Sequence, residues 1–248
     1  MTSQIVLLTA TITPRTGQPS LAVVDPAERL NDYKNALTFY DGLLRGKVID
    51  GIVFVENSGF DLTPLRESFP SPCIEWITTY DMDYPGTYHR GYGEFRLIDR
   101  AMADSALIAA LPAAGVVWKV TGRYIVENMA TVIRFAPKTF DVYCASTAQW
   151  TELSLMAWTR HGHATLLREA WRQFATSKAP ELILAPRLMA ADPAQCLVVT
   201  ELSWPPLLVG RRGTDGGQFT GRLARWKFTA SLLPRLWRLR FQSATRRR

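Results

Sequence analysis

Residues 116–128 read VVWKVTGRYIVEN, an apolar run that turns polar around a glycine and then becomes apolar again. Its first five residues are β-branched or aromatic apart from Lys119, which predicts a short strand buried on both faces. In open α/β sheets, ligands bind beyond the carboxyl ends of the strands. The residues expected at that edge are Lys119, Thr121, Gly122 and Arg123. Two cations and a glycine there suit a phosphate group.

A second interpretation gives these cations no ligand. Lys119 could run along apolar neighbours to the surface, and Arg123 could pair with a nearby carboxylate. Residue type alone does not separate the two interpretations, so both are carried to the structure.

The chain before this stretch alternates between strand patterns and helix patterns. Strands are expected at 5–12, 51–57 and 73–78, and helices at 25–46, 61–69 and 94–111, the last one led by Gly91-Tyr92-Gly93. Such alternation is typical of an α/β fold with a mainly parallel central sheet and right-handed crossovers.

The pattern after Asn128 is less regular. Residues 129–137 fit a strand or an irregular segment, 140–145 a strand with one solvated face, 164–174 an amphipathic helix, 180–190 a short helix, and 196–200 a strand. This region is expected to complete the same domain.

The net charge of +7 belongs to the end of the chain. All 22 acidic residues lie at or before Asp215, whereas residues 222–248 carry nine cations. The remaining body has 20 basic and 22 acidic residues, which argues against a nucleic-acid-binding surface spread over the domain. Three separated cysteines and the lack of a signal-peptide pattern or a long apolar run predict a cytoplasmic protein.

Residues 222–248 combine these cations with an apolar stripe. Leu223, Trp226, Ala230, Leu233, Trp237 and Phe241 recur three or four apart. Tryptophan with flanking arginine is typical of a helix in a membrane interface, so a basic amphipathic tail that binds anionic lipid is predicted. A terminal helix docked on the domain is the alternative, and RNA binding is less favoured because the tryptophans share one stripe.

Residues 208–217 form a glycine-rich stretch that contains Arg211 and Arg212. Backbone amides and guanidinium groups in such a loop can contact phosphate. The spacing does not match a Walker loop, and a flexible linker to the tail is the alternative interpretation.

The order of these parts resembles GT-A-type glycosyltransferases, in particular small bacterial enzymes of lipopolysaccharide or capsule synthesis. The resemblance covers about residues 4–145. It rests on the first strand ending in small and hydroxyl residues, the Glu56-Asn57-Ser58-Gly59 end of the second strand, the glycine-led helix, and the segment from Lys119 to Tyr124.

This resemblance implies a Rossmann-type sheet and a nucleotide-sugar donor across the edge of its first four strands. The base would lie near Thr9, Ala10, Thr11, Glu56 and Asn57, and the diphosphate near Lys119, Thr121, Gly122 and Arg123, with the Gly91 and Gly93 amides. In the family an Asp-X-Asp motif at the fourth strand holds a divalent cation, whereas this chain has Thr121-Gly122-Arg123 there. We therefore expect cationic side chains to neutralise the phosphates, with no cofactor firmly implied.

An Asp-X-Asp sequence occurs earlier, at Asp81-Met82-Asp83. Two carboxylates at that spacing can share a hard cation, so a Mg²⁺ or Mn²⁺ site there is the alternative to the cationic hypothesis. A solvated turn capped by Asp81 would explain the same residues without a metal.

Transfer to a hydroxyl needs a general base, which is commonly a carboxylate. Asp141 is the first candidate, because it opens a strand just after the donor half, Glu152 is the second, and Glu201 is a further carboxylate beyond the donor half.

The chain is accordingly divided into a nucleotide-sugar-binding half (1–145), an acceptor-side half of the same domain (146–221) and the tail (222–248). The predicted activity is hexosyltransferase-like transfer to a lipopolysaccharide, capsule or other lipid-linked glycan at the inner face of the membrane, with no nucleic-acid partner. The alternatives are a non-catalytic nucleotide- or partner-binding protein at the membrane surface, and a nucleotidyltransferase that uses Asp81 and Asp83.

Overall fold

The computed structural model describes residues 2–15, 21–212 and 215–219, and the fold is traced over these three ranges. The predicted membrane-binding tail, residues 222–248, lies outside them. Within the described ranges, no helix is long and apolar enough to cross a membrane.

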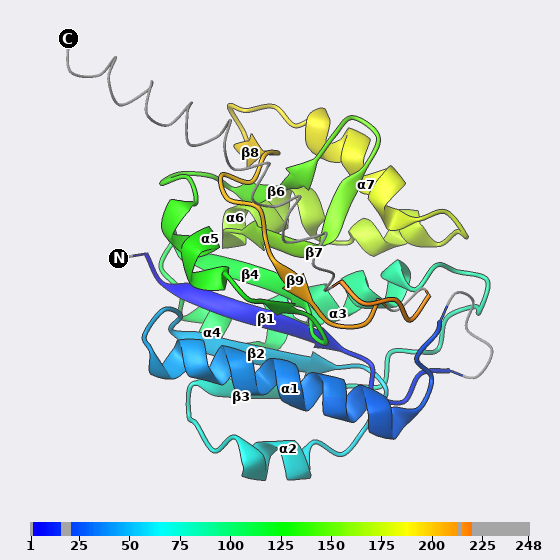
Figure 1. The fold of residues 1–248 in the computed structure, drawn as a ribbon. Coiled ribbons are helices and arrows are strands. Elements are labelled where there is room, and N and C mark those ends of the chain that lie inside the picture. The colour runs from blue at the N-terminus through cyan, green and yellow to red at the C-terminus, as the bar shows by residue number, and fades with distance from the viewer. Residues whose placement is uncertain (1, 16–20, 213–214, 220–248) are drawn as a thin grey trace.

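One seven-stranded sheet forms the centre of the domain, with helices on both sides (Figure 1). Its order is β3-β2-β1-β4-β7-β6-β8. The strands are β1 (Gln4–Ala10), β2 (Gly51–Glu56), β3 (Ile74–Thr78), β4 (Val116–Thr121), β6 (Val142–Ser146), β7 (Thr151–Trp158) and β8 (Val198–Val199). Only β7 runs against its neighbours, so the predicted mainly parallel α/β sheet is confirmed.

The four strands β3-β2-β1-β4 form the regular part of the sheet. Alternate residues of β1 pack into two separate cores: Val6 and Leu8 face one, and Ile5 and Leu7 the other. Helix α1 (Pro26–Arg45) covers the first face and α3 (Gly91–Asp104) the second. Because both faces are covered, β1, β2 and β4 are mainly apolar, which explains why the sequence pattern located them. In β3, at the edge of the sheet, only Ile74 is buried.

Helix α1 begins where the sequence predicts. The Asp25 side chain accepts a hydrogen bond from the Ala27 backbone nitrogen at 2.9 Å, and Pro26 occupies the first helical position. A short helix, α2 (Thr63–Ser68), follows β2.

The helix expected over 94–111 divides into two. Helix α3 ends before Ser105, whose extended backbone starts α4 (Ala106–Ala109). The Ser105 side chain accepts from the Ile108 nitrogen, and Glu75 accepts from the Ala106 and Leu107 nitrogens. A serine cap and a carboxylate from β3 therefore stop one helix and begin the next.

The second half of the chain departs most from the sequence-based prediction. Residues expected as strand or irregular segment form α5 (Met129–Phe135), and the helix expected over 164–174 is replaced by a π-helical turn (His163–Leu167) and a 3₁₀ turn (Ala170–Phe174). Asp99 explains the second difference, because it binds the His163 ring, the Glu169 nitrogen and the Trp171 ring nitrogen. Those contacts hold Glu169 at a φ of 58° between the two turns, which a continuous helix excludes.

The remaining elements are short. They are α6 (Arg160–Gly162), α7 (Pro180–Met189), and β5 (Ile125–Val126), which pairs with β9 (Leu208–Val209) in a separate two-stranded sheet. The three cysteines are free, and burial raises the pKa of Cys144 to about 12.

Candidate active site

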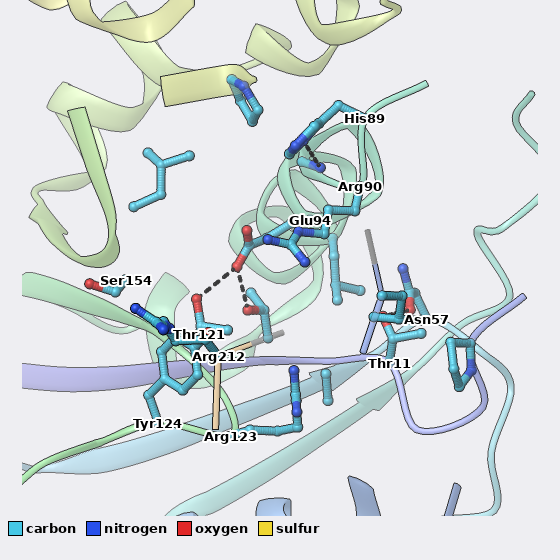
Figure 2. Close-up of a pocket in the computed structure, with 18 of the residues that line it drawn as sticks. Thr11, Asn57, His89, Arg90, Glu94, Thr121, Arg123, Tyr124, Ser154 and Arg212 are labelled. Carbon is cyan, nitrogen blue, oxygen red and sulfur yellow. Dashed lines mark hydrogen bonds between the residues drawn. The ribbon is translucent and has the colours of Figure 1, made fainter. Parts of the chain in front are cut away.

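A pocket of about 440 Å³ opens beyond the carboxyl ends of β1, β2 and β4. The chain leaves β1 toward β2 and β3 and then returns to place β4 on the other side of β1. Such a switch point is where ligands bind in open α/β sheets. The pocket is lined by the ends of these strands, the start of α3, β7 and the start of α7 (Figure 2).

The floor of the pocket depends on a close approach between β1 and the end of β4. The Gly122 nitrogen donates to the Thr9 carbonyl at 3.0 Å, and a Cβ on Gly122 would lie 2.5 Å from that oxygen. A side chain is therefore excluded by the backbone beneath the pocket. This contact explains Gly122 without a phosphate.

Lys119 does not project into the pocket. Its side chain is 1% exposed, and its Nζ lies 2.6 Å from Glu94 Oε1 and 2.6 Å from the Leu153 carbonyl. The structure therefore corrects the expectation of a free Lys119 charge for phosphate. The apolar neighbours that identified the strand also bury its lysine, and a buried ammonium requires a partner.

Glu94, in the first turn of α3, connects β1, β4 and α3. It accepts from Thr9 Oγ1 at 3.0 Å and from Thr121 Oγ1 at 3.3 Å (Figure 2). Burial opposes its ionisation, but the Lys119 charge and hydrogen bonds from Lys119 and Thr9 outweigh burial, so the pKa of Glu94 is lowered. Glu94 is therefore an ionised carboxylate that connects α3 to β1 and β4 at the side of the pocket.

Arg123 lines the pocket and is 7% exposed. Its Nη1 lies 3.5 Å from Asp32 on α1, as the alternative interpretation expected. Asp32 is also bound at 3.2 Å by Arg211, which contacts Glu28 as well. Arg123 thus shares one carboxylate with another arginine while facing the pocket.

The two arginines of the glycine-rich stretch separate. Arg211 faces α1 through Glu28 and Asp32, and it is not among the residues that line the pocket. Arg212 lines the pocket, with its guanidinium 2.8 Å from Asp215. Of this pair, Arg212 alone lines the pocket.

The polar ends of β1 and β2 have different roles. Glu56 is fully buried and accepts from the backbone nitrogens of Ile12, Ser58 and Phe60 and from the Ser58 hydroxyl, so it organises the loops rather than facing a ligand. The pocket-lining residues at these strand ends are Thr9, Ala10, Thr11 and Asn57. Thr11 donates to Asn57 Oδ1 at 2.6 Å (Figure 2).

Arg29 is a cation that the sequence analysis missed. It lines the pocket, is 5% exposed, and donates to the Thr11 and Val23 carbonyls and to the Tyr33 hydroxyl. Among the described residues no carboxylate pairs with it, and the residues outside those ranges include no Asp or Glu. Its place in the first turn of α1, four residues after the Asp25 cap, was the only signal in the sequence.

The glycines that begin α3 serve packing. A Cβ on Gly91 would overlap the Pro180 ring of α7, and one on Gly93 would overlap the Tyr84 hydroxyl. The Gly91 nitrogen donates to His89 Nδ1 at 3.2 Å, and burial followed by the Arg90 charge lowers the pKa of His89. The Gly91 N–H therefore already donates to the His89 imidazole. This contact corrects the expectation that the Gly91 N–H binds phosphate. Gly93 does not line the pocket.

The Asp81 and Asp83 carboxylates both bind Arg96. Their distances to its guanidinium are 3.1 Å and 2.9 Å, and the hydrogen bond from Arg96 lowers the pKa of Asp83. Among the described residues there is no cluster of three or more His, Cys, Asp or Glu that could hold a metal ion. As arranged here, with an arginine between them, these two carboxylates do not fit a divalent cation.

Asp141 lies away from this pocket. Its carboxylate accepts from the Thr159 hydroxyl at 3.1 Å and from the Leu197 nitrogen at 2.8 Å, beside a second cavity at another edge of the sheet. Asp141 thus caps chain turns, whereas Glu152, the second candidate base, does line the pocket. Asp141 was predicted because it precedes a strand. That position does not show at which end of the sheet the residue lies.

Glu181 is a pocket carboxylate that the sequence analysis missed. It lies in the first turn of α7, and its Oε2 is buried with no hydrogen-bond partner among the described residues. Burial raises the pKa of Glu181, Glu94 and Glu152 add to the increase, and Arg90 opposes it. Nothing in the local sequence distinguishes Glu181 from an ordinary acidic residue at a helix start.

No protein-family model matches the chain, and no curated protein matches its sequence. Similar solved structures include a candidate nucleotide-diphospho-sugar transferase from Desulfovibrio desulfuricans G20, with 12% identity and a TM-score of 0.49, covering 80% of this chain and 79% of that one. Another is a 4-diphosphocytidyl-2C-methyl-D-erythritol synthase from Anaerococcus prevotii DSM 20548, with 11% identity and a TM-score of 0.43, covering 93% and 96%. These likenesses assign no activity to this chain.

Proposed function

We propose that the protein is a glycosyltransferase that binds a nucleotide-sugar donor in the pocket beyond β1, β2 and β4. Its acceptor would be a lipopolysaccharide, capsule or other lipid-linked glycan, and its residues 146–221 would form the acceptor side. The observation that carries the proposal is Arg29, a buried guanidinium that faces the pocket without a carboxylate partner among the described residues.

The position and size of the pocket support a donor of this class. It lies at the switch point of the sheet, and about 440 Å³ is within the range of small-molecule sites. Hydroxyl and amide groups of Thr11 and Asn57 line the same region. These groups can hydrogen-bond a base or a ribose.

The charges on this side support binding of a diphosphate. Burying a guanidinium is unfavourable unless an anion compensates it. Among the residues that the structure describes, Arg29 has only carbonyl and hydroxyl acceptors, and Arg123 shares Asp32 with Arg211. A donor diphosphate would supply the missing negative charge, and the two guanidiniums would stabilise the charge of the leaving nucleoside diphosphate.

A thermal-shift screen tests donor binding. UDP-, GDP-, CDP- and dTDP-sugars are added with and without Mn²⁺, and a ligand at 100 times its Kd is expected to stabilise the protein by about 2.7 kcal/mol. Arg29→Gln should weaken binding by about 10- to 100-fold, because a hydrogen bond to a charged group contributes about 1.5–3 kcal/mol. Arg29→Lys keeps the charge and should bind with intermediate affinity.

Arg45→Gln is the matched control, since Arg45 lies on the same helix with a 73% exposed side chain. It should bind the donor as the wild type does. No shift with any nucleotide sugar, or equal binding by Arg29→Gln and Arg45→Gln, would overturn the donor site. Release of pyrophosphate from a nucleoside triphosphate, without release of nucleoside diphosphate from a nucleotide sugar, would indicate a nucleotidyltransferase.

The tail extends the proposal to the membrane. Residues 222–248 carry nine cations, no acid and two tryptophans at helical spacing, and a cation near anionic lipid contributes about 1 kcal/mol. We expect the full chain to sediment with phosphatidylserine vesicles and a chain ending at residue 221 to remain in the supernatant. Equal sedimentation of both would contradict this part of the proposal.

A further inference from the structure

We infer that the wall formed by β7 and the start of α7 is the acceptor subsite for an uncharged hydroxyl compound, and that Glu181 accepts the proton of the attacking hydroxyl. This inference rests on the proposed glycosyl transfer and names its acceptor class and proton acceptor.

Ser154 is the first observation. It lies on β7, is 6% exposed and lines the pocket, and its Oγ is buried without a partner among the described residues. Its neighbour Leu153 accepts a hydrogen bond from Lys119, which fixes the strand beside it. Figure 2 shows Ser154 on the side of the pocket away from Thr11 and Asn57. An unpaired buried hydroxyl is unfavourable, and a hydroxyl ligand would satisfy it.

Glu181 is the second observation, and it lies on a different element. Its Oε2 is buried and unpartnered among the described residues, while the other two pocket glutamates have partners: Glu94 binds Lys119, and Glu152 Oε1 accepts from the Ser154 nitrogen. The packing of Pro180 against Gly91 fixes the start of α7 above α3. Among these carboxylates, only Glu181 has a buried oxygen without a hydrogen-bond partner among the described residues.

The charges of this wall indicate the class of acceptor. Two carboxylates, Glu152 and Glu181, lie on this wall, and Arg90 is the cation whose charge acts on Glu181. Phosphorylated acceptors would be repelled by the ionised carboxylates. A neutral sugar hydroxyl, by contrast, can donate to Glu181 and accept from Ser154.

The proposed step balances without another reactant. The acceptor oxygen forms a bond to the donor anomeric carbon, and the bond from that carbon to the diphosphate oxygen breaks, with its electron pair leaving on the nucleoside diphosphate. The acceptor proton passes to Glu181 Oε2. A carboxylate whose pKa is raised toward the working pH is a better proton acceptor than an ordinary one.

The burial that raises the pKa of Glu181 also lowers the stability of the folded protein when this carboxyl is ionised. Its folded pKa is raised, so the folded state holds the proton more tightly than the unfolded state does. The stability linked to Glu181 is present below its unfolded pKa and is lost as the pH rises through the folded value. Glu181→Gln removes this loss, and its melting temperature at pH 8 should equal or exceed that of the wild type.

The test measures nucleoside diphosphate release from the donor that binds in the thermal-shift screen, with water and methyl glucoside as hydroxyl probes. Glu181→Gln should lower kcat by about 10²- to 10⁴-fold, the usual contribution of a general base, while its donor Kd stays unchanged. Glu181→Asp should recover part of kcat. The acid limb of the pH profile should lie above the ordinary glutamate range in the wild type and disappear in Glu181→Gln.

Glu67→Gln, on the exposed face of α2, is the matched control and should turn over normally. Unchanged kcat in Glu181→Gln with intact donor binding overturns the inference alone, and so does faster release with glucose 6-phosphate than with methyl glucoside. If the wild type binds no nucleotide sugar, the proposed function fails and this inference falls with it.

Discussion

The two walls of the pocket differ in how their polar groups are satisfied. On the β1 and β4 side, the Lys119 charge is bound by Glu94, and that carboxylate also accepts from Thr9 and Thr121. On the β7 and α7 side, Ser154 Oγ and Glu181 Oε2 are buried without partners among the described residues. The polar groups of the first wall are paired with one another, whereas the second wall has two buried polar atoms without partners among the described residues.

This difference separates residues that build the site from residues that contact a ligand. Lys119 and Glu94 look like catalytic groups by type, but their bonds to each other hold the start of α3 against β4. Glu181, by contrast, has a buried oxygen without a partner among the described residues, which is unfavourable for folding. A buried polar group without a partner is therefore the better indicator of function here.

The largest expected effect on stability comes from removing Glu94 from the β1 and β4 side of the pocket. Glu94→Ala leaves Lys119 charged and buried without a counter-charge, which should cost about 3–5 kcal/mol in the free energy of unfolding. Urea denaturation measures it. Glu152→Gln, in the same pocket but exposed, should change stability by no more than about 0.5 kcal/mol. A similar small loss for both variants would contradict the division between the walls.

A smaller effect is expected where the two walls meet. Gly91→Ala places a methyl group against the Pro180 ring, and such overpacking costs about 1–3 kcal/mol. Because the start of α7 must move, nucleotide release should fall as well. Gly42→Ala provides the contrast, since a Cβ there has no neighbour within 4 Å. That variant should gain about 0.5–1 kcal/mol from helix propensity. A stable, active Gly91→Ala would refute the positioning role of this contact.

The smallest effect on stability is expected on the β7 and α7 side of the pocket. Ser154→Ala removes a hydroxyl with no partner among the described residues, so thermal unfolding should show a change within about 0.5 kcal/mol. Ser105→Ala removes a serine that caps Ile108 and should cost about 1 kcal/mol. If Ser154→Ala destabilised the protein more than Ser105→Ala did, its hydroxyl would have a structural role instead.

Sequence reasoning was most accurate for the first half of the fold. Strands β1, β2 and β4 are covered on both faces, so they are mainly apolar runs, and helix α1 carries its own Asp25 cap and Pro26 start. It failed where distant residues decide local structure. Glu75 stops α3 at Ser105, and Asp99 divides the helix expected over 164–174.

The candidate site was only partly accessible to the same reasoning. Thr121 and Arg123 were predicted from a strand end, Thr9, Ala10, Thr11 and Asn57 from the family resemblance, and Glu152 as a carboxylate beyond the donor half. The structure brings all seven to one pocket. Asp141 and Arg211 are directed elsewhere, and Glu56 is enclosed by backbone nitrogens. Arg29 and Glu181 were missed because a residue in the first turn of a helix gives no sign of which cavity it faces.

The sequence alone determined which segments are buried, and with them an alternating α/β chain whose polar strand ends meet at one edge of a parallel sheet. Local apolarity, β-branching and helix caps are sufficient for that. Only the tertiary structure decided which charges are neutralised and which remain without partners, because pairing depends on the distance between groups far apart in the chain. Lys119 and Glu94 are 25 positions apart and in contact, and no local pattern encodes such a contact.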